Sequence, residues 1–241
     1  MEKSLDFLDL SCCRWVFLWD KEEEKVLHTG KEALEAWQWY RREGKTQRWQ
    51  LAFPFRAGIL QSSWALNKSL AHFFGQQKKR TRSIKPLNLL VASANTPLEK
   101  QKIQQLVQQN SLRPVKLIDR ADFFADYLNR TKNFSKLKLI IDLNQDFIEL
   151  SLFLETNRLK TKHLALGDFL EDQDLMDKLK LVLDAFLLNL PRDLFAQKWQ
   201  YFYIFMSPAL KQKIDIDDFN RHLQMEAIVN QQQLKDYVKS I

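Results

Sequence analysis

The segment from Leu139 to Phe153 constrains the fold of this chain more than any other stretch. An apolar run ends at Asp142, the polar turn Asn144-Gln145-Asp146 follows, and a second apolar run returns to Phe153. This pattern predicts a strand, a tight turn and an adjoining strand. A phosphate group would need bare backbone N–H groups in such a turn, which glycine permits and bulkier residues obstruct. Asp146 would also repel an anion, so the turn is unsuited to a phosphate group.

Glycine is scarce throughout the chain. Only five glycines occur among 241 residues. An average content of about 7% would give roughly three times as many. Phosphate-binding loops of the P-loop, dinucleotide and kinase types are built on closely spaced glycines. The sequence therefore excludes all three types of loop.

Strand and helix signals alternate along the chain in two similar parts. Before the hairpin we expect extended arms at 5–10 and 14–19, which form a β-hairpin or one long bent strand. We also expect an extended stretch at 26–28, helices at 31–42, 58–74 and 121–128, and strands at 87–93 and 115–118. After it we expect an extended arm at 158–165, a helix at 175–190, a strand at 201–205 and a helical tail from 217. Thr96, Pro97 and Glu99 predict one more helix, which starts with a capping box. Hairpins followed by β-α-β-α units, given twice, predict a two-lobed α/β protein.

Composition places the chain among soluble globular proteins. It is 45% hydrophobic, and no apolar run is long enough to cross a bilayer. The Met-Glu-Lys start lacks a secretory hydrophobic region, which favours a cytoplasmic location. The two cysteines, Cys12 and Cys13, are neighbours in a predicted strand and point to opposite faces, so we expect neither a disulfide nor a zinc site.

Several short sequence patterns, in the same order along the chain, resemble MreB, the bacterial actin. In MreB, actins and heat-shock chaperone ATPases, a strand ends in Asp, turns through glycines and Thr, and returns as a second strand. The matching stretches here are Asp9-Leu10, Lys25–Ala33, Pro54–Leu60, Thr96–Lys100, Val115–Asp119, Leu139–Phe153 and Ile204–Leu210. In the hairpin after Asp142, Phe147 and Ile148 replace the Thr pair. The resemblance implies an actin-like fold with degenerate nucleotide motifs.

That fold consists of two ribonuclease H-type lobes. We expect the first lobe at 1–135, with a reduced outer subdomain near 20–53, and the second at 136–241. The second lobe is expected to lack its outer subdomain, because too few residues separate Gly167 from the next predicted helix. The sequence departs from the family at every loop that contacts nucleotide, so the family's ATPase residues cannot be transferred to it.

The degenerate nucleotide-site positions that the resemblance assigns are Asp9, Ser11, Asp119, Asp142, Asn144, Asp146 and Ser207. We expect no catalytic residue, no metal site and no cofactor. Asp9 and Asp142 are interpreted as strand-end caps, with a residual hard-cation site as the alternative. Asp119 is interpreted as the partner of a local ion pair, since Arg120 follows it.

The chain carries a net charge of +7, concentrated in two groups. The first is the basic patch Lys78, Lys79, Arg80, Arg82 and Lys85, and the second is Arg41, Arg42, Lys45 and Arg48. Such groups either form solvated loops or contact anionic lipid, whereas a nucleic-acid role rests on charge alone. A peripheral location at the inner face of the cell membrane follows from the MreB resemblance. Aromatic residues between Trp37 and Phe55 would mark a partner surface where they are exposed.

We interpret the chain as a non-catalytic, MreB-like bacterial scaffold of the cytoskeleton or cell envelope, a pseudo-ATPase with a role in cell shape. Its expected partners are proteins: itself, an MreB-like filament or the envelope machinery. Two alternatives are a cytoplasmic actin-fold scaffold of a secretion or pilus machine and an ATP-dependent filament protein. Trp15, Phe147 and Ile148 are expected to fill the cleft between the lobes and to hold one arrangement without nucleotide.

Overall fold

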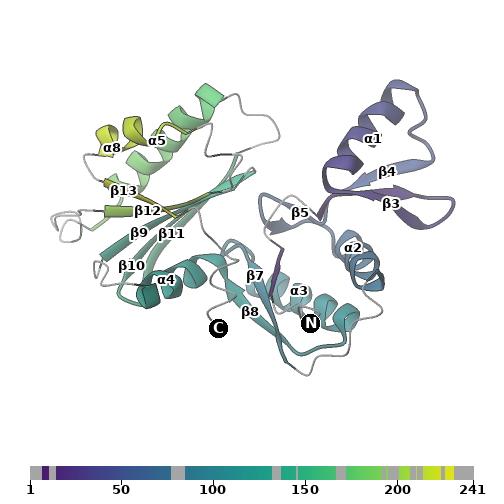
Figure 1. Cartoon of the computed structure of the whole chain (residues 1–241), viewed down its shortest axis with the longest axis horizontal. Coiled ribbons are helices and arrows are strands. Elements are labelled where there is room, and N and C mark those ends of the chain that lie inside the picture. The colour runs from purple at the N-terminus through teal and green to yellow at the C-terminus, as the bar shows by residue number, and fades with distance from the viewer. Residues whose placement is uncertain are drawn as a thin grey trace. The chain divides into compact units, whose positions relative to one another are not determined.

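The chain folds into two compact units, Met1–Ile118 and Asp119–Ile241 (Figure 1). The computed structural model describes residues 7–10, 15–76, 85–131, 137–144, 146–166, 172–191, 194, 201–206, 210, 214–223 and 226–230. The division between the units falls earlier than the lobe boundary expected at 135/136. The reason is α4 (Arg120–Thr131), which packs on the strands of the second unit.

The first unit is built on a three-stranded sheet in the order β1-β7-β8. Its strands are β1 (Phe7–Asp9), β7 (Leu87–Val91) and β8 (Val115–Asp119). Helices α2 (Ser63–Gly75) and α3 (Pro97–Ser111) pack against each other and cover a core that includes Leu66, Leu89 and Ile103. The expected capping box of α3 is confirmed, because Thr96 Oγ1 accepts from Glu99 N–H while the Glu99 carboxylate accepts from Thr96 N–H.

A second, smaller sheet in this unit has the order β3-β2-β4. It is formed by β2 (Phe17–Asp20), β3 (Lys25–Thr29) and β4 (Trp49–Ala52), and α1 (Gly30–Arg42) packs on it. The expectation that arms 5–10 and 14–19 form one hairpin or one bent strand is wrong. They belong to separate sheets, because β1 pairs in parallel with β7 while β2 lies between β3 and β4.

The helix expected at 58–74 begins later than its apolar spacing suggests. Its first residues instead belong to a short hairpin of β5 (Phe55–Arg56) and β6 (Ile59–Leu60), with a turn at Ala57 and Gly58, both at positive φ. Asn95 holds this hairpin, since its Oδ1 accepts from Leu60 N–H and its Nδ2 donates to Gly58 O. The helix begins after this hairpin, where Ser62 caps it by accepting a hydrogen bond from Ala65 N–H.

The second unit contains a five-stranded sheet in the order β11-β10-β9-β12-β13. Its strands are β9 (Leu137–Leu143), β10 (Phe147–Leu154), β11 (Asn157–Ala165), β12 (Tyr201–Met206) and β13 (Glu226–Asn230). The expected hairpin is confirmed, because β9 and β10 are antiparallel with Leu143 opposite Ile148. Of the tail expected to be helical from 217, the described residues form α8 (Ile216–Leu223) and then β13, which lies beside β12.

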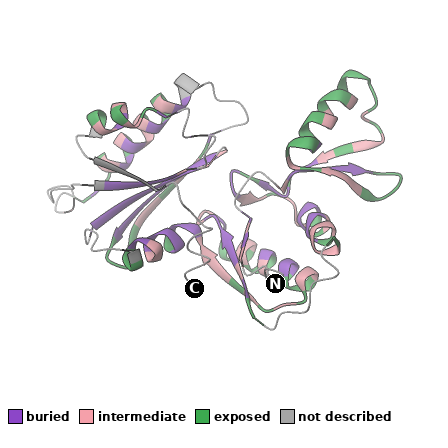
Figure 2. Ribbon diagram, viewed as in Figure 1, coloured by how far each residue is buried: buried purple, intermediate pink, exposed green. Residues whose placement is uncertain are grey.

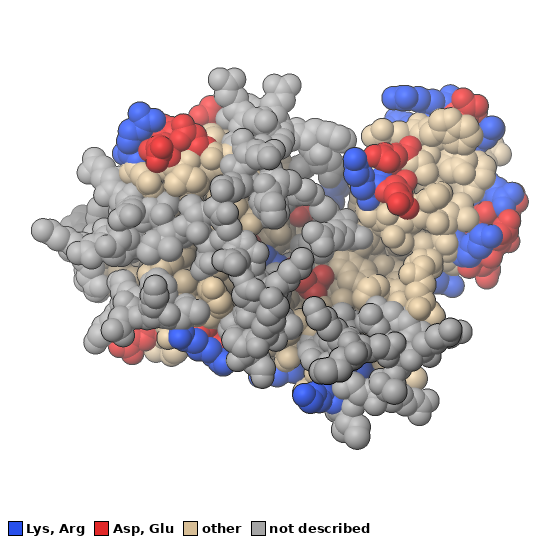
Figure 3. All heavy atoms as spheres, in the orientation of Figure 1, with Lys and Arg blue, Asp and Glu red and all other residues tan. Residues whose placement is uncertain are grey.

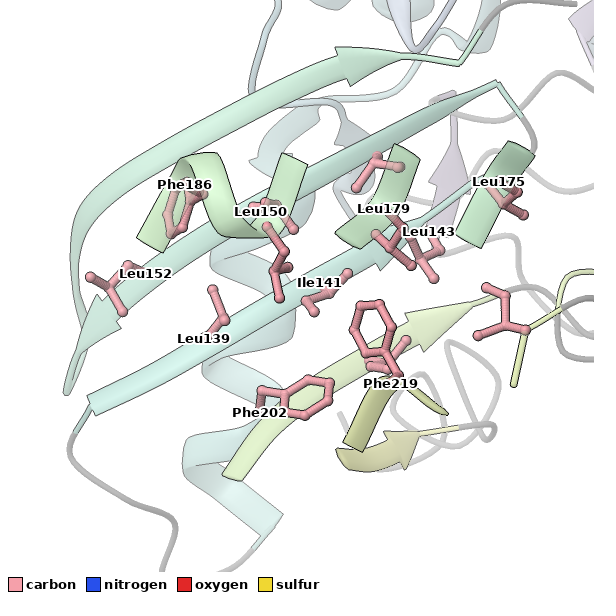
Figure 4. Close-up of a cluster of buried hydrophobic side chains, with 14 of the residues drawn as sticks. Leu139, Ile141, Leu143, Leu150, Leu152, Leu175, Leu179, Phe186, Phe202 and Phe219 are labelled. Atoms are coloured by element: carbon pink, nitrogen blue, oxygen red, sulfur yellow. The ribbon is translucent and has the colours of Figure 1, made fainter. Parts of the chain in front are cut away.

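Alternate side chains of β9 and β10 point to opposite faces of this sheet. On one face the side chains of these two strands are all apolar, and α5 (Asp172–Leu188) and α8 cover them. Figure 4 shows Leu175, Leu179 and Phe186 of α5 and Phe219 of α8 over this face. Figure 2 shows β9 and β10 buried along nearly their whole length. The other face carries the polar residues of the candidate site.

Candidate functional site

The turn between β9 and β10 is closed by its own backbone and packed with apolar side chains. Asn144 N–H donates to Phe147 O at 2.9 Å. Phe147 is fully buried and stacks on the ring of His163 with 4.8 Å between centroids, and Ile148 lies in the apolar core. Ile148 is therefore buried within its own unit, which contradicts the expectation that it fills a cleft between lobes. Phe147 packs on a ring of the same unit.

Asp142, at the end of β9, is held by a two-pronged ion pair. Arg120 Nε donates to Asp142 Oδ2 at 2.6 Å, and Arg120 Nη2 donates to Asp142 Oδ1 at 3.0 Å. The side chains are only 7% and 3% exposed, respectively. Asn144 Nδ2 adds a third hydrogen bond to Oδ1 at 3.1 Å. Both carboxylate oxygens therefore accept from protein donors, with the parallel geometry that suits an arginine fork.

A row of polar side chains runs across the sheet beside this ion pair. Glu149 lies directly opposite Asp142 in β9 and directly opposite His163 in β11, and it is 1% exposed. His163 Nδ1 lies 3.4 Å from the Glu149 carboxylate. Like charges directly opposite each other destabilise a sheet, so the Arg120 guanidinium, which binds Asp142, offsets the repulsion between Asp142 and Glu149.

Asp119 forms an ion pair, but its partner comes from β11. Arg158 Nη2 donates to Asp119 Oδ2 at 2.8 Å and lies 3.5 Å from Asp122 Oδ2. Burial opposes the charge of Arg158, yet the Asp119 hydrogen bond and both carboxylates raise its pKa above the ordinary value. Asp119 thus forms an ion pair, but the partner is Arg158, 39 residues along the chain, and not the local one that the sequence suggested. The neighbouring Arg120 pairs with Asp142.

The remaining predicted site positions are only partly described. Asp9 is half-buried at the end of β1, where Trp15 Nε1 donates to its backbone oxygen at 2.9 Å and the Trp15 ring packs on Phe73. Asp146 accepts from Leu166 N–H through its backbone oxygen. Outside the described residues lie Ser11, Cys12, Cys13, Ser207 and the patch members Lys78, Lys79, Arg80 and Arg82. Lys85, the last member of the patch, is exposed.

Two members of the second basic group, Lys45 and Arg48, pair with acidic neighbours. Arg48 pairs with Asp20, Glu22 and Glu23, and Lys45 pairs with Glu43. Figure 3 shows positive and negative side chains interspersed over this part of the chain. The aromatic residues divide as expected, because Tyr40 stacks on Trp49 whereas Trp39 and Phe53 are 52% and 46% exposed.

Glu149 and His163 were not identified as site residues from the sequence. The sequence did contain a signal for Glu149. A hairpin whose turn is centred on Gln145-Asp146 pairs residue 149 with Asp142 across the two strands. His163 and the Arg120 contact depend on how β11 and α4 pack, which no local pattern encodes. Among the described residues, no group of three or more His, Cys, Asp or Glu side chains is arranged to hold a metal ion. Within the same residues, no helix combines the length and apolarity needed to span a membrane.

Comparisons with known proteins identify the fold. No protein-family model matches the sequence, and no curated protein matches it. Among solved structures, the chain is similar to MreB 5 of Spiroplasma citri bound to AMPPNP, with 13% identity and a TM-score of 0.64 over 89% of this chain and 83% of that one. It is also similar to MreB5 of Spiroplasma citri bound to ADP, with 17% identity and a TM-score of 0.50 over 70% of this chain and 48% of that one. The chain therefore has a divergent form of the MreB-like actin fold.

Proposed function

We propose that this chain is a non-catalytic cytoskeletal or cell-envelope scaffold that acts through protein contacts and needs no nucleotide. The proposal combines the MreB-like fold with the state of Asp142. By the sequence resemblance, Asp142 stands where actin-like ATPases place the carboxylate that acts beside the nucleotide and its metal. Here that carboxylate is neutralised by Arg120 inside the second unit.

The residues around Asp142 fit a nucleotide and its metal poorly. A hard cation needs free carboxylate oxygens, and both oxygens of Asp142 accept from Arg120 or Asn144. A phosphate needs exposed backbone N–H groups, and the Asn144 N–H is already hydrogen-bonded to Phe147 O. The described part of this turn also lacks glycine. These features support a pseudo-ATPase.

Calorimetric titration with ATP and ADP in the presence of Mg²⁺ tests this proposal. We expect no measurable heat of binding for the natural chain. The matched variant Arg120→Met with Asp142→Leu should behave identically, because it replaces the ion pair by apolar groups of similar size. Micromolar binding by the natural chain that disappears in this variant would overturn the proposal.

An ATP-dependent filament protein is the second candidate. The observation that favours it is the comparison itself, since the two similar MreB structures hold AMPPNP and ADP. A nucleotide that binds despite the Arg120 contact would have to displace the guanidinium from Asp142. The Arg120→Ala variant would then bind nucleotide more tightly than the natural chain, whereas a pseudo-ATPase gains no affinity from it.

We propose a peripheral site of action at the inner face of the cell membrane as part of the same role. Its support is the basic patch in the sequence, whose cations would each contribute about 1 kcal/mol near an anionic surface. The partners in this proposal are the chain itself, MreB-like filaments or envelope proteins. The exposed Trp39 and Phe53 offer aromatic contacts of the kind that protein interfaces favour.

A further inference from the structure

The two edges of the small sheet β3-β2-β4 differ in how they are protected. β3, at one edge, carries Lys25, and its register with β2 is shifted. The longer edge strand β11 carries Arg158 and Lys162 and also has a register shift. Charged side chains and bulges of this kind keep the edge of a sheet from pairing with another chain. β4, at the other edge of the small sheet, has no charge in Trp49–Ala52 and pairs with β2 without a shift.

The backbone of β4 presents hydrogen-bonding groups along this edge. Lys21 N–H donates to Arg48 O at 3.0 Å, in line with the antiparallel ladder between β2 and β4. Hydrogen-bonded pairs alternate along such a ladder, so the N–H and C=O groups of Trp49 and Leu51 point away from β2. These groups have no backbone partner within the described residues. They are therefore available to the backbone of an added strand.

Aromatic side chains line the α1 side of this edge. Trp49 stacks on Tyr40 of α1 with 3.8 Å between the ring centroids, and Leu51 lies on the same face of β4 as Trp49. Trp39, whose ring contacts that of Tyr40, is 52% exposed, and Phe53, just after β4, is 46% exposed. An added strand could therefore bury every second side chain against this aromatic surface, which is how strand addition achieves specificity.

The indole of Trp49 supplies an independent indication. Its Nε1 atom is buried and donates to no acceptor within the part of the chain that the structure describes. A buried indole N–H normally has a hydrogen-bond acceptor, and an unsatisfied one calls for an explanation. An acceptor that arrives with a bound segment would account for it.

Charge indicates which kind of segment suits this edge. Lys45 Nζ lies 5.1 Å from the centre of the Trp39 ring, and the Arg48 guanidinium lies 5.5 Å from that of Trp49. Acidic neighbours balance these two cations, whereas Arg42 is exposed and forms no ion pair with any described residue. Arg42 follows Trp39 by three positions, so the two are neighbours on the helix surface. The chain as a whole has a net charge of +7, which repels a second copy and attracts an acidic partner.

We propose that β4 binds an extended, acidic segment of a different protein, which adds a strand to the sheet β3-β2-β4. Apolar side chains at alternate positions of the segment pack on Trp39, Trp49 and Phe53. An acidic residue lies at the end of the segment that is near Arg42 and Lys45. The inference rests on the proposed function in taking a protein as the partner, and it specifies which segment of that partner binds. Nucleotide has no part in this contact.

Selection of short random peptides, displayed on phage, against the full chain tests this proposal. We expect the selected peptides to share alternating apolar residues and an acidic end. Hydrogen exchange measured by NMR on the full chain with one such synthetic peptide then locates the contact. The amides of Trp49 and Leu51 should exchange more slowly when the peptide is bound. The amide of Gln50, which faces β2, should keep its protection.

Three variants and one control test the parts of the contact by peptide affinity. Leu51→Pro removes an outward N–H and spares the ladder to β2, since proline is tolerated at such edge positions, and it should weaken binding. Trp39→Ala, at a half-exposed residue, should weaken binding by on the order of tenfold or more. Arg42→Glu with Lys45→Glu should slow association and reduce its dependence on salt. The matched control Leu34→Ser changes an exposed residue of α1 that points about 140° away from Trp39, and it should leave affinity unchanged.

Several outcomes would overturn the proposal. One is a selection that yields no peptide, or peptides without the alternating pattern. Another is a peptide that binds without protecting the Leu51 amide, or whose affinity falls no more with Trp39→Ala than with Leu34→Ser. A dimer of the chain alone that Leu51→Pro abolishes would assign the edge to a second copy. Because the peptide is bound without nucleotide, ATP binding by the chain would overturn the pseudo-ATPase proposal and leave this one standing.

Discussion

Replacing Arg120 by alanine should destabilise the second unit more than any surface substitution. Arg120 and Asp142 are 7% and 3% exposed at their side chains, so the variant leaves a carboxylate buried without its fork. Removing one partner of a buried ion pair costs about 3–5 kcal/mol. The directly opposed Glu149 adds a second buried carboxylate, which places the expected loss toward the upper end. A domain with a total stability of about 5–15 kcal/mol would lose a large part of it.

Two matched variants separate this effect from the loss of a side chain in general. Arg130→Ala removes an exposed pair with Asp126 from the same helix, and an exposed pair of this kind contributes only about 0.3–0.5 kcal/mol. The double variant Arg120→Met with Asp142→Leu removes both charges together. It should be neutral or more stable by about 1–4 kcal/mol, because neither member of the pair is then left buried without its partner.

Denaturant unfolding followed by far-ultraviolet circular dichroism measures these differences. Because two compact units need not unfold together, hydrogen exchange of the β9 and β10 amides should accompany it. If Arg120→Ala lowers the free energy of unfolding by less than about 1 kcal/mol, no more than Arg130→Ala does, the reasoning is refuted. So would a double variant less stable than Arg120→Ala alone.

Three further predictions concern other parts of the chain. The Arg48 hydrogen bond lowers the pKa of Asp20 from 3.8 to about 2. The stabilisation from this ion pair is therefore complete above the unfolded-state pKa of 3.8 and is lost as the pH falls toward 2. Tryptophan fluorescence should show the small sheet weakening in this range, and Asp20→Asn should remove that part of the pH dependence. Thr96→Ala breaks the capping box of α3 and should cost about 1 kcal/mol in denaturant unfolding, and an unchanged midpoint would contradict this. Changing Lys78, Lys79, Arg80 and Arg82 to Ser should weaken co-sedimentation with anionic liposomes by several fold per cation removed. Equal binding by the natural chain and this variant would contradict a role of the patch in membrane binding.

Local patterns predicted most of the elements but not their partners. The hairpin after Leu139 followed from two apolar runs around a polar turn, and the start of α3 followed from Thr96, Pro97 and Glu99. Such signals lie within a few residues of one another, so a sequence displays them directly. By contrast, the separation of β1 and β2 into two sheets depends on the pairing of β1 with β7, which lies far along the chain.

The candidate site shows the same division. The replacement of the glycines after Asp142 was visible in the sequence, and it implied lost phosphate chemistry. The ion pair that occupies Asp142 was not visible, because Arg120 is 22 residues away and its contact requires α4 to pack on β9. Phe147 and Ile148 were assigned to a cleft because they replace polar family residues, yet strand alternation places Ile148 in the core of its own unit and Phe147 stacks on His163 of the same unit.

The dependence of self-association on nucleotide tests the central proposal most directly. Sedimentation of the full chain over a range of concentrations, with Mg²⁺ and with or without ATP, measures it. If the chain is a nucleotide-independent scaffold, the two sedimentation profiles will coincide at every concentration, whatever the size of the assembly. Assembly that forms only with ATP, and that Arg120→Met with Asp142→Leu abolishes, would contradict the account.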